Sequence, residues 1–507
     1  MFRLTHHQIL SSLKHTSTRI RLYSGKASLN SNQDDPQLDF RSFVEVLRKD
    51  GDLADIYQEV DPNLEIGAIV RRVSETNAKA PIFHNVKGTR NGLWKIFGNA
   101  ASLRNEDKFR YGRIARSLGL PPDSNWKDIL EKMRLATTRD PLPPNILSTG
   151  QCKQNKIFGD DIDLTNLPVP LLHQGDGGKY LQTWGVHILE TPDKSWTNWS
   201  VFRGMVHDKR RLSCLVIPGQ HNSMIRDQWL KVGKDKVPWA LSLGAPPAAN
   251  IAASIPLPPG VSEEDYVSAL TGKSLDMVKC ELNDLLVPAN SEIILEGTFS
   301  LKDKALEGPF EDYIGMHFEG EAGNQPLFTV DAITYRDGAI LPVSVPGRLT
   351  DESHTTASMA SVQLLEALQQ HDLPIKDAVA PLETLATWCI LQVDSKKLAE
   401  MKTNPDELST TIGNIAFNYV IWAYTSRCRP GIDEYVFDEV MGLPLTPYRK
   451  YGRGSSVKGG KMVCNCLLAM EYDGGRIFRS VDFRSSYPPE LQEKIEGRWT
   501  EMGFDAV

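Results

Sequence analysis

The most informative chemistry in this sequence lies between Trp196 and Gly204, which reads Trp-Thr-Asn-Trp-Ser-Val-Phe-Arg-Gly. The run is typical of a β-strand, whose successive side chains point to opposite faces. Asn198 and Ser200 would share one face, and Arg203 would lie on the other. Burying a polar side chain on each face is costly, so either a bulge redirects one of them or both face a polar cavity. The alternative is an edge strand with a solvated arginine.

A second group of charged side chains lies in Glu307-Gly-Pro-Phe-Glu-Asp312. Gly308-Pro309 predicts a turn, which lets the acids on its two sides converge. Two carboxylates beside one arginine would differ in pKa. The carboxylate paired with the arginine stays ionised, and burial raises the pKa of the other until it can donate a proton. A solvated acidic turn would have the same sequence.

A third group could bind a metal ion. His221 follows the predicted strand Leu212–Ile217 across a Pro218-Gly219 turn. The side chains of Asn198, His221 and Glu263 would together suit a divalent cation such as Mn²⁺ or Mg²⁺. Their wide spacing carries no recognisable pattern, and a single histidine after a strand is equally compatible with a structural role.

The N-terminal third predicts an α/β layer that would support these groups. A helix is expected over Phe40–Asp50, because its apolar residues recur at helical spacing, and a strand is expected over Leu53–Val60. A second helix follows over Leu64–Thr76, and short strands are expected near Pro81 and Trp94. A further helix is expected over Ser124–Leu135, with Asp123 as its cap.

The middle third is rich in strands. Three closely spaced runs predict a β-meander, and three later runs predict further strands; such strands usually close into a barrel. The six runs are Leu181–Leu189, Trp196–Val206, Leu212–Ile217, Glu292–Leu301, Leu327–Tyr335 and Ala339–Val345. The last third alternates helix and strand, beginning with a helix over Thr355–His371. A C-terminal helix after Pro488-Pro489 carries a stripe of apolar residues.

Composition and the N-terminal residues limit the functional class and indicate a cellular location. The chain has 507 residues and a net charge of −7, which argues against nucleic-acid binding, and it contains no GxGxxG, GxxxxGK[ST] or GxSxG motif. Residues 1–33 contain no acid but several basic and hydroxyl residues, which predicts a mitochondrial presequence. A disordered tail on a cytoplasmic protein is the alternative.

Several motifs in this order closely resemble the UbiD family and, within it, the fungal ferulic (phenylacrylic) acid decarboxylases. They are Lys179-Tyr-Leu-Gln-Thr, the Trp196–Gly204 run, Glu307-Gly-Pro-Phe, Gly347-Arg-Leu-Thr-Asp-Glu-Ser-His354 and Gly459-Gly-Lys461. The resemblance extends from about Leu38 to the C-terminus. It implies an α/β (α+β) fold with a central split β-barrel flavin-binding domain between α/β domains, and a homodimer. The expected divisions are a presequence over 1–35, an N-terminal domain over 36–155, the flavin-binding barrel over 156–346, a dimerisation domain over 347–487 and a final helix over 488–507.

The same resemblance implies a reaction. Family members remove CO₂ from α,β-unsaturated aromatic acids such as cinnamic, ferulic and coumaric acid and release styrenes. They use prenylated FMN, which a partner flavin prenyltransferase makes, and the cofactor serves as an electron sink that no side chain can supply. A UbiD-type decarboxylase acting on another aromatic acid is the nearest alternative.

The resemblance also assigns residues. Arg203 and Glu307 match the family's arginine–glutamate pair, and Asp312 takes the place of the protonating glutamate, one methylene shorter. The implied Mn²⁺ ligands are Asn198, His221 and Glu263, and the implied K⁺ site uses Trp199, Ala252, Ala253, Ile255 and Glu263. The implied flavin contacts are Asn198, Trp199, Ser200, Val201, Phe202, Arg203, Gln220, His221 and Glu263. The substrate pocket would be lined by Ile217, Gln220, Tyr313, Ala357 and Leu443.

One departure from the family concerns Asn418, which runs directly into Tyr419 and Val420. Roughly two dozen residues that the family has there are missing, including a lysine that contacts the flavin phosphate, and a helical pattern passes to a strand pattern without a turn. Either the coding sequence was read incompletely or the chain is a true variant. The chain as written is therefore expected to bind prenylated FMN poorly. A non-catalytic flavin-binding paralogue and, more weakly, a metal hydrolase using His221 stay open.

Overall fold

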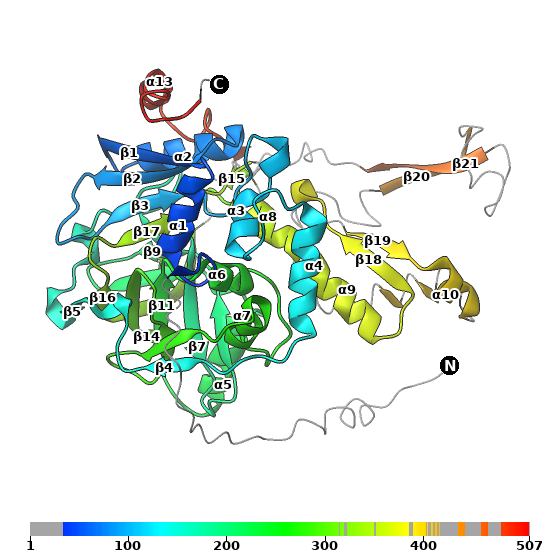
Figure 1. Cartoon of the computed structure of the whole chain (residues 1–507), viewed down its shortest axis with the longest axis horizontal. Helices are drawn as coiled ribbons and strands as arrows, with labels where there is room; N and C mark the ends of the chain where they lie inside the picture. Colours follow the sequence, from blue (N-terminus) through cyan, green and yellow to red (C-terminus); the bar gives the residue numbers. More distant parts are fainter. Residues whose placement is uncertain are drawn as a thin grey trace. The chain divides into compact units, whose positions relative to one another are not determined.

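The computed structural model describes residues 34–313, 315–318, 322–348, 351–384, 389–401, 403, 407–408, 411–412, 415, 434–441, 458–464 and 478–505. Within them the chain forms a mixed α/β fold with several sheets (Figure 1). Among the helices of the described part, none is long and apolar enough to cross a membrane. The junction at Asn418–Val420 and the predicted pocket residue Leu443 lie outside the described residues.

The N-terminal layer matches most of its prediction. Helix α1 (Phe40–Lys49) begins at Asp39, whose side chain accepts the Ser42 N–H, and it buries its apolar stripe. The neighbouring sheet has the order β1-β2-β3-β17, and helix α2 (Glu65–Thr76) follows β1 along the chain. Its strands are β1 (Leu53–Val60), β2 (Ala80–Val86), β3 (Lys95–Gly98) and β17 (Ile340–Val343).

Two details of this region differ from the prediction. Strand β17 was expected beside the barrel strands, but it pairs in parallel with β3 and completes the N-terminal sheet. Helix α4 (Trp126–Thr137) is capped by Asn125, not by Asp123. Asn125 and Asp128 satisfy each other's main-chain N–H groups, and this capping box sets the start of the helix two residues later than expected.

The central sheet has nine strands in the order β6-β9-β10-β16-β14-β11-β7-β8, with β5 paired to β16. Their bounds are β5 (Asn155–Phe158), β6 (Tyr180–Gln182), β7 (Gly185–Glu190), β8 (Thr197–Ser200), β9 (Gly204–Val206), β10 (Arg211–Cys214), β11 (Lys236–Leu243), β14 (Ile293–Glu307) and β16 (Gly323–Tyr335). Helices α6 (Pro247–Ala253) and α7 (Glu263–Thr271) lie beside β8.

The predicted meander is wrong, and the reason explains the curl of the sheet. Strands β8 and β9 lie near opposite ends of the strand order, yet only Val201–Arg203 join them. Strands β6 and β7 are likewise joined by Thr183 and Trp184 alone. Links of two or three residues span roughly 10 Å, so the two edges of the sheet must approach each other. The sheet curls into a split barrel, and we call the place where its edges meet the seam.

The remaining α-helices and strands of the described part continue along the chain. They are α3 (Gly112–Ser117), β4 (Asn145–Leu147), α5 (His221–Lys231), β12 (Asp276–Lys279), β13 (Leu286–Pro288), β15 (Met316–Phe318), α8 (Glu352–Met359), α9 (Ser361–Gln370), β18 (Ile375–Val379), β19 (Ile390–Val393), α10 (Ser395–Glu400), β20 (Glu434–Met441), β21 (Lys458–Cys464), β22 (Phe478–Ser480) and α13 (Pro489–Gly497). The predicted helix Thr355–His371 is two helices that meet at Ala360.

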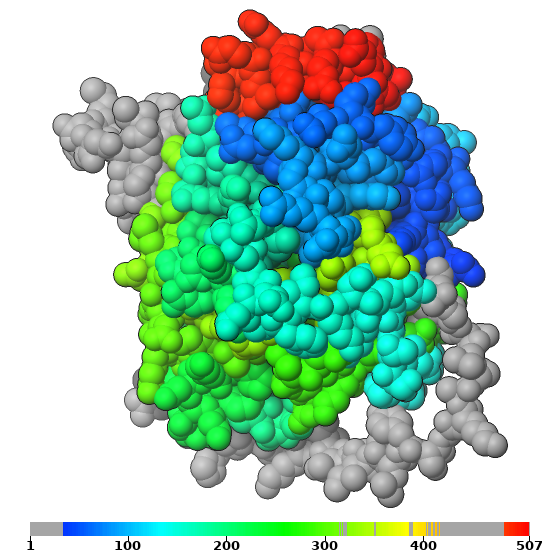
Figure 2. All heavy atoms as spheres, turned by 90° about the vertical axis from the view of Figure 1, so that its left-hand side faces the viewer, coloured from blue at the N-terminus to red at the C-terminus, as the bar shows by residue number. Residues whose placement is uncertain are grey.

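The C-terminal segment returns to the N-terminal layer. Helix α13 packs on α2, and Figure 2 shows the residues at the C-terminus covering the N-terminal layer. Lys494 and Arg498 both contact the buried Glu65 carboxylate, at 2.7 and 3.2 Å. Strand β22, just before this helix, pairs with β15 next to the predicted acidic turn. The C-terminus therefore helps to fix the surroundings of that turn.

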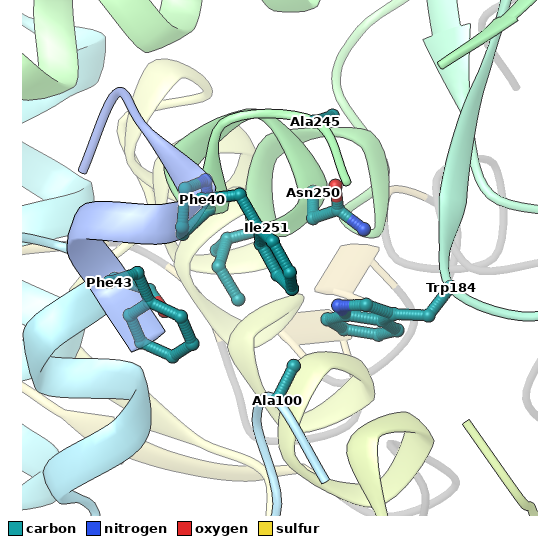
Figure 3. A pocket seen from close by; sticks show the side chains of 9 residues that line it. Phe40, Phe43, Ala100, Trp184, Ala245, Asn250 and Ile251 are labelled. Atoms are coloured by element: carbon teal, nitrogen blue, oxygen red, sulfur yellow. The ribbon is translucent and has the colours of Figure 1, made fainter. Parts of the chain in front are cut away.

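A small cavity lies between α1, α6 and Trp184 (Figure 3). Its volume is about 10 Å³, and its lining is mostly apolar, with Phe40, Phe43 and Ile251 around it. That volume is about what one water molecule needs. The cavity is therefore too small to be a substrate site.

Candidate active site at the barrel seam

Arg203 lies in the break between β8 and β9, at the seam of the barrel. The strand predicted from Trp196 to Val206 ends at Ser200 and resumes at Gly204, so the break redirects the arginine, as one of the two sequence interpretations required. Its Nε and Nη2 donate to the two carboxylate oxygens of Glu307 at 2.8 and 3.0 Å. Its guanidinium carbon lies 4.9 Å from the centre of the Phe310 ring. The side chain is 17% exposed, so the charge is largely enclosed.

Glu307 is the last residue of β14 and is 2% exposed. Besides the two bonds from Arg203, it accepts a hydrogen bond from the Tyr180 hydroxyl at 2.7 Å. Burial and the nearby Glu307 charge raise the pKa of Tyr180, so this tyrosine is a neutral donor at physiological pH. Burial lowers the pKa of Arg203, but its bonds to Glu307 and the charge of Asp312 outweigh this and raise it. The sequence did not single out Tyr180, although it belongs to one of the resembling motifs.

Asp312 approaches Arg203 from the other side of the Gly308-Pro309 turn. Its Oδ2 accepts a hydrogen bond from Arg203 Nη1, and its Oδ1 accepts the Tyr313 N–H at 2.7 Å. Loss of hydration raises the pKa of Asp312, while the Arg203 charge opposes the rise and the charges of Asp351 and Glu307 add to it. The side chain is 28% exposed, against 2% for Glu307. The structure therefore brings the three residues together and makes Asp312 the more accessible acid.

The link that carries Arg203 rests on a buried histidine that the sequence did not indicate. The His187 ring stacks on Phe202 at 3.6 Å between ring centres. Its Nδ1 accepts the Trp239 indole N–H at 2.9 Å, and its Nε2 lies 3.0 Å from the Phe202 carbonyl oxygen. These bonds define a neutral ring with its proton on Nε2. Burial lowers the pKa of His187 to about 3.

This histidine predicts a pH dependence of stability. Its pKa is lower in the folded chain than the ordinary 6.5, so its contribution is complete above pH 6.5 and is lost as the pH falls toward 3. Between pH 7 and pH 5 the loss should reach about 2 kcal/mol. Urea unfolding at both pH values would measure it, and in His187→Gln the decrease should be smaller by about that amount. Equal decreases in the two proteins would contradict the assignment.

The three proposed Mn²⁺ ligands also converge, next to β8. His221 is the first residue of α5, and its Nδ1 lies 2.9 Å from Asn198 Oδ1 and 4.0 Å from Glu263 Oε1. Glu263 Oε2 accepts the Trp199 N–H at 2.6 Å. No cluster of three His, Cys, Asp or Glu side chains suited to a metal occurs in the described part of the chain, so this set depends on its amide ligand.

The pKa shifts of Glu263 and His221 are consistent with a cation bound between these side chains. Burial raises the pKa of Glu263 to about 8 and lowers the pKa of His221 to about 4. A buried carboxyl whose ionised form is disfavoured would gain from a nearby positive charge, and a histidine that stays neutral can serve as a metal ligand. The donor set therefore fits a divalent ion of Mn²⁺ type.

The proposed K⁺ ligands lie on β8, at Glu263, the first residue of α7, and at and just beyond the C-terminal end of α6. The Ala253 carbonyl accepts the Val201 N–H at 3.2 Å, which joins this end of the helix to the seam. The carbonyls of Ala252 and Ile255 accept N–H groups at 3.4 and 3.0 Å. A carbonyl oxygen has two lone pairs, so each retains capacity for a cation.

The other predicted contacts divide into two groups. The side chains of Trp199 and Phe202 are buried in the apolar core, so only their main chain could face a cofactor. The predicted pocket residues in the described part of the chain are all partly buried. Ile217 and Gln220 precede α5, Tyr313 follows the acidic turn, and Ala357 lies in α8. Their grouping into one substrate pocket stays a prediction.

Three consecutive parts of the chain match domains of one family. Residues 44–133, 145–349 and 414–466 match the N-terminal, Rift-related and C-terminal domains of 3-octaprenyl-4-hydroxybenzoate carboxy-lyase. The chain is 43% identical over 497 residues to ferulic acid decarboxylase 1 of Saccharomyces cerevisiae, covering 92% of this chain and 99% of that one. It is 40% identical over 492 residues to pyrrole-2-carboxylic acid decarboxylase of Pseudomonas aeruginosa, covering 92% and 98%.

Solved structures agree on the fold. Vanillic acid decarboxylase of Sedimentibacter hydroxybenzoicus in its closed form superposes with a TM-score of 0.67 at 23% identity, over 92% of this chain and 98% of that one. An evolved dimeric form of the UbiD-class enzyme HmfF from Pelotomaculum thermopropionicum, in complex with prFMN, superposes with a TM-score of 0.64 at 23% identity, over 86% and 96%. The fold predicted from the family resemblance is therefore confirmed, and this chain belongs to the UbiD family of carboxy-lyases.

Proposed function

We propose that this protein uses prenylated FMN to decarboxylate α,β-unsaturated aromatic acids of the cinnamic, ferulic and coumaric type, releasing a styrene and CO₂. The observation that carries the proposal is the enclosed Arg203, which holds Glu307 with two bonds and Asp312 with a third. The ferulic acid decarboxylase relative supports the choice of substrate class.

The residues divide the reaction between them. Arg203 would bind the substrate carboxylate, because a guanidinium matches a carboxylate with two parallel bonds. Glu307, itself held by Tyr180, keeps the guanidinium in place. Loss of CO₂ leaves an electron pair on the alkene carbon, and Asp312 would supply the proton that this carbon takes up. Its raised pKa and its partial exposure suit that role.

The cofactor would lie along the seam. Prenylated FMN, when bound, supplies the electron sink that accepts the pair left by CO₂. Its phosphate would lie near the start of α5, where the Gln220 side chain makes no capping bond and the main-chain N–H groups favour an anion. Asn198, His221 and Glu263 would hold Mn²⁺. The carbonyls of Trp199, Ala252, Ala253 and Ile255, together with Glu263, would hold K⁺.

The test is product formation by protein made together with a flavin prenyltransferase. Headspace gas chromatography should detect styrene from cinnamate, with turnover expressed per bound flavin so that weak cofactor retention does not hide the reaction. Pyrrole-2-carboxylate is the comparison substrate, because a relative acts on it. Turnover of pyrrole-2-carboxylate but not cinnamate would overturn the substrate class, and turnover of neither would favour the non-catalytic paralogue.

Metal binding gives a prediction that needs no cofactor. Mn²⁺ at about 100 times its dissociation constant should stabilise the folded apoprotein by about 2.7 kcal/mol and raise its melting temperature. Differential scanning fluorimetry should show that Glu263→Gln removes this rise. Glu264→Gln is the matched control, because burial also raises the pKa of Glu264, to about 7, and it lies outside the ligand set. A Glu263→Gln protein that responds like wild type would rule out these ligands.

Two wider expectations belong to the same proposal. We infer a homodimer, which a dimeric relative supports, and sedimentation would measure it. We also propose that residues 1–35 direct import into mitochondria. Fluorescent fusions with and without those residues would test this, and a cytoplasmic full-length fusion would contradict it.

A further inference from the structure

One short segment, residues 173–180, contacts both ends of the turn that carries Glu307 and Asp312. At its end, the Tyr180 hydroxyl donates to Glu307. In its middle, the Gly177 N–H donates to the Pro309 carbonyl at 2.7 Å. A Cβ at Gly177 would lie only 2.0 Å from the Gly308 carbonyl oxygen, so the main chain of the segment approaches the turn at a distance that only a glycine allows. The turn between Glu307 and Asp312 is therefore packed directly on this segment.

Within this segment, Asp176 contacts the residue that precedes Asp312. Its Oδ1 accepts the main-chain N–H of Glu311, the residue before Asp312, at 2.9 Å. Its Oδ2 accepts the His173 N–H at 3.0 Å and lies 3.2 Å from His173 Nδ1. The side chains of Asp176 and His173 are both fully buried. This carboxylate ties the acidic turn to a buried histidine.

The Glu311 side chain strengthens the same junction. Its Oε1 accepts the Gly175 N–H at 3.2 Å, and its Oε2 accepts the hydroxyl of Ser486 from the C-terminal segment. Burial alone would lower the pKa of His173, but the charges of Asp176 and Glu311 outweigh burial and raise it. The two carboxylates and the histidine thus compensate one another's charges beneath the turn.

We infer that Asp176 is a positioning residue for the proton donor: by holding the main chain of Glu311, it fixes where Asp312 meets Arg203. This inference rests on the proposed function, because it assigns the proton to Asp312. Asp312 is one methylene shorter than the glutamate that the family resemblance implies, so its reach depends on the position of the turn. A displacement of about 1 Å at a reacting group can cost about 10²-fold in rate.

The test compares two variants of the holoenzyme. Asp176→Ala removes the acceptor of the Glu311 N–H and should lower kcat by about 10- to 100-fold, with KM for cinnamate within about twofold of wild type. Asp176→Asn retains one oxygen that can accept that N–H but turns its amide NH2 toward the His173 N–H, so its kcat should lie between that of Asp176→Ala and that of wild type. Asp39→Ala is the control, since Asp39 is also a buried carboxylate but pairs with Ser42 and Arg336.

Hydrogen exchange of the apoprotein gives a readout independent of activity. Peptides covering residues 307–313 should exchange faster in Asp176→Ala, and those covering β11 should not change. Wild-type kcat in Asp176→Ala, an equal loss in Asp176→Asn, or the same loss in Asp39→Ala would each overturn the inference. A wild-type holoenzyme that makes no styrene would instead refute the proposed function, while the exchange result still tests the contact itself.

Discussion

Replacing Arg203 with alanine is expected to abolish styrene formation, with a fall in kcat of about 10³-fold or more. The change removes the cation that would bind the substrate carboxylate. Glu307 and Asp312 also lose the arginine to which both are bonded. Headspace chromatography of the cofactor-loaded variant would measure it. Turnover at the wild-type rate would refute the assignment.

This variant needs a stability control. Removing Arg203 leaves Glu307 buried without its cation, which typically costs about 3–5 kcal/mol and can unfold the protein. Arg203→Lys keeps the charge but loses the two parallel bonds, so it should fold and still lose about 10²-fold in kcat. Arg210→Ala is the matched control on the surface, where Arg210 pairs with Asp331. Its turnover should equal that of wild type.

The second large effect is expected at Asp312. Asp312→Asn preserves the shape of the side chain but removes the acidic proton, so kcat should fall by about 10²- to 10⁴-fold. Asp312→Glu restores the acid that the family resemblance implies and should keep or exceed the wild-type rate. Because the donor must be protonated, activity should decline as the pH rises through the raised pKa of Asp312. Steady-state kinetics across pH would measure both effects.

Two results would contradict the role of Asp312. One is an Asp312→Asn protein with wild-type kcat, which would place the proton elsewhere. The other is an alkaline decline that persists in that variant with the same midpoint, since it would then belong to another group.

Local sequence patterns were enough to predict the bounds of the first helix and strand of the N-terminal layer. The bounds of β1 (Leu53–Val60) agree with the prediction, and α1 ends one residue earlier than expected. Both elements are amphipathic along their own length, so their periodicity carries the information. The position of β17 could not be found this way, because its partner β3 lies more than 200 residues earlier in the chain.

The seam shows why the barrel was harder to predict. From Trp196 to Arg203 the sequence has no glycine or proline to mark a break. The break arises because β8 pairs with β7 whereas β9 pairs with β10, and these pairings belong to opposite edges of the sheet. An apolar run with strand propensity cannot show which edge each half joins.

The sequence allowed the reacting residues of the site to be recognised, but not the residues that hold them in place. The sequence and the family resemblance singled out Arg203, Glu307 and Asp312, and the structure brings these three together. Tyr180 and Asp176 were not singled out, since they contact Glu307 and Glu311 across more than 120 residues. Both precede or begin a short strand in a Gly-rich stretch, where no periodicity shows the direction of a side chain.

The most direct test of the account is decarboxylation of cinnamate in D₂O by the cofactor-loaded wild-type protein, with the styrene analysed by mass spectrometry and NMR. We predict one deuterium per styrene, on the carbon that carried the carboxylate, and about 10²-fold slower formation by Asp312→Asn. No styrene from protein that contains the flavin, or equal rates for wild type, Asp312→Asn and Arg203→Ala, would contradict the account.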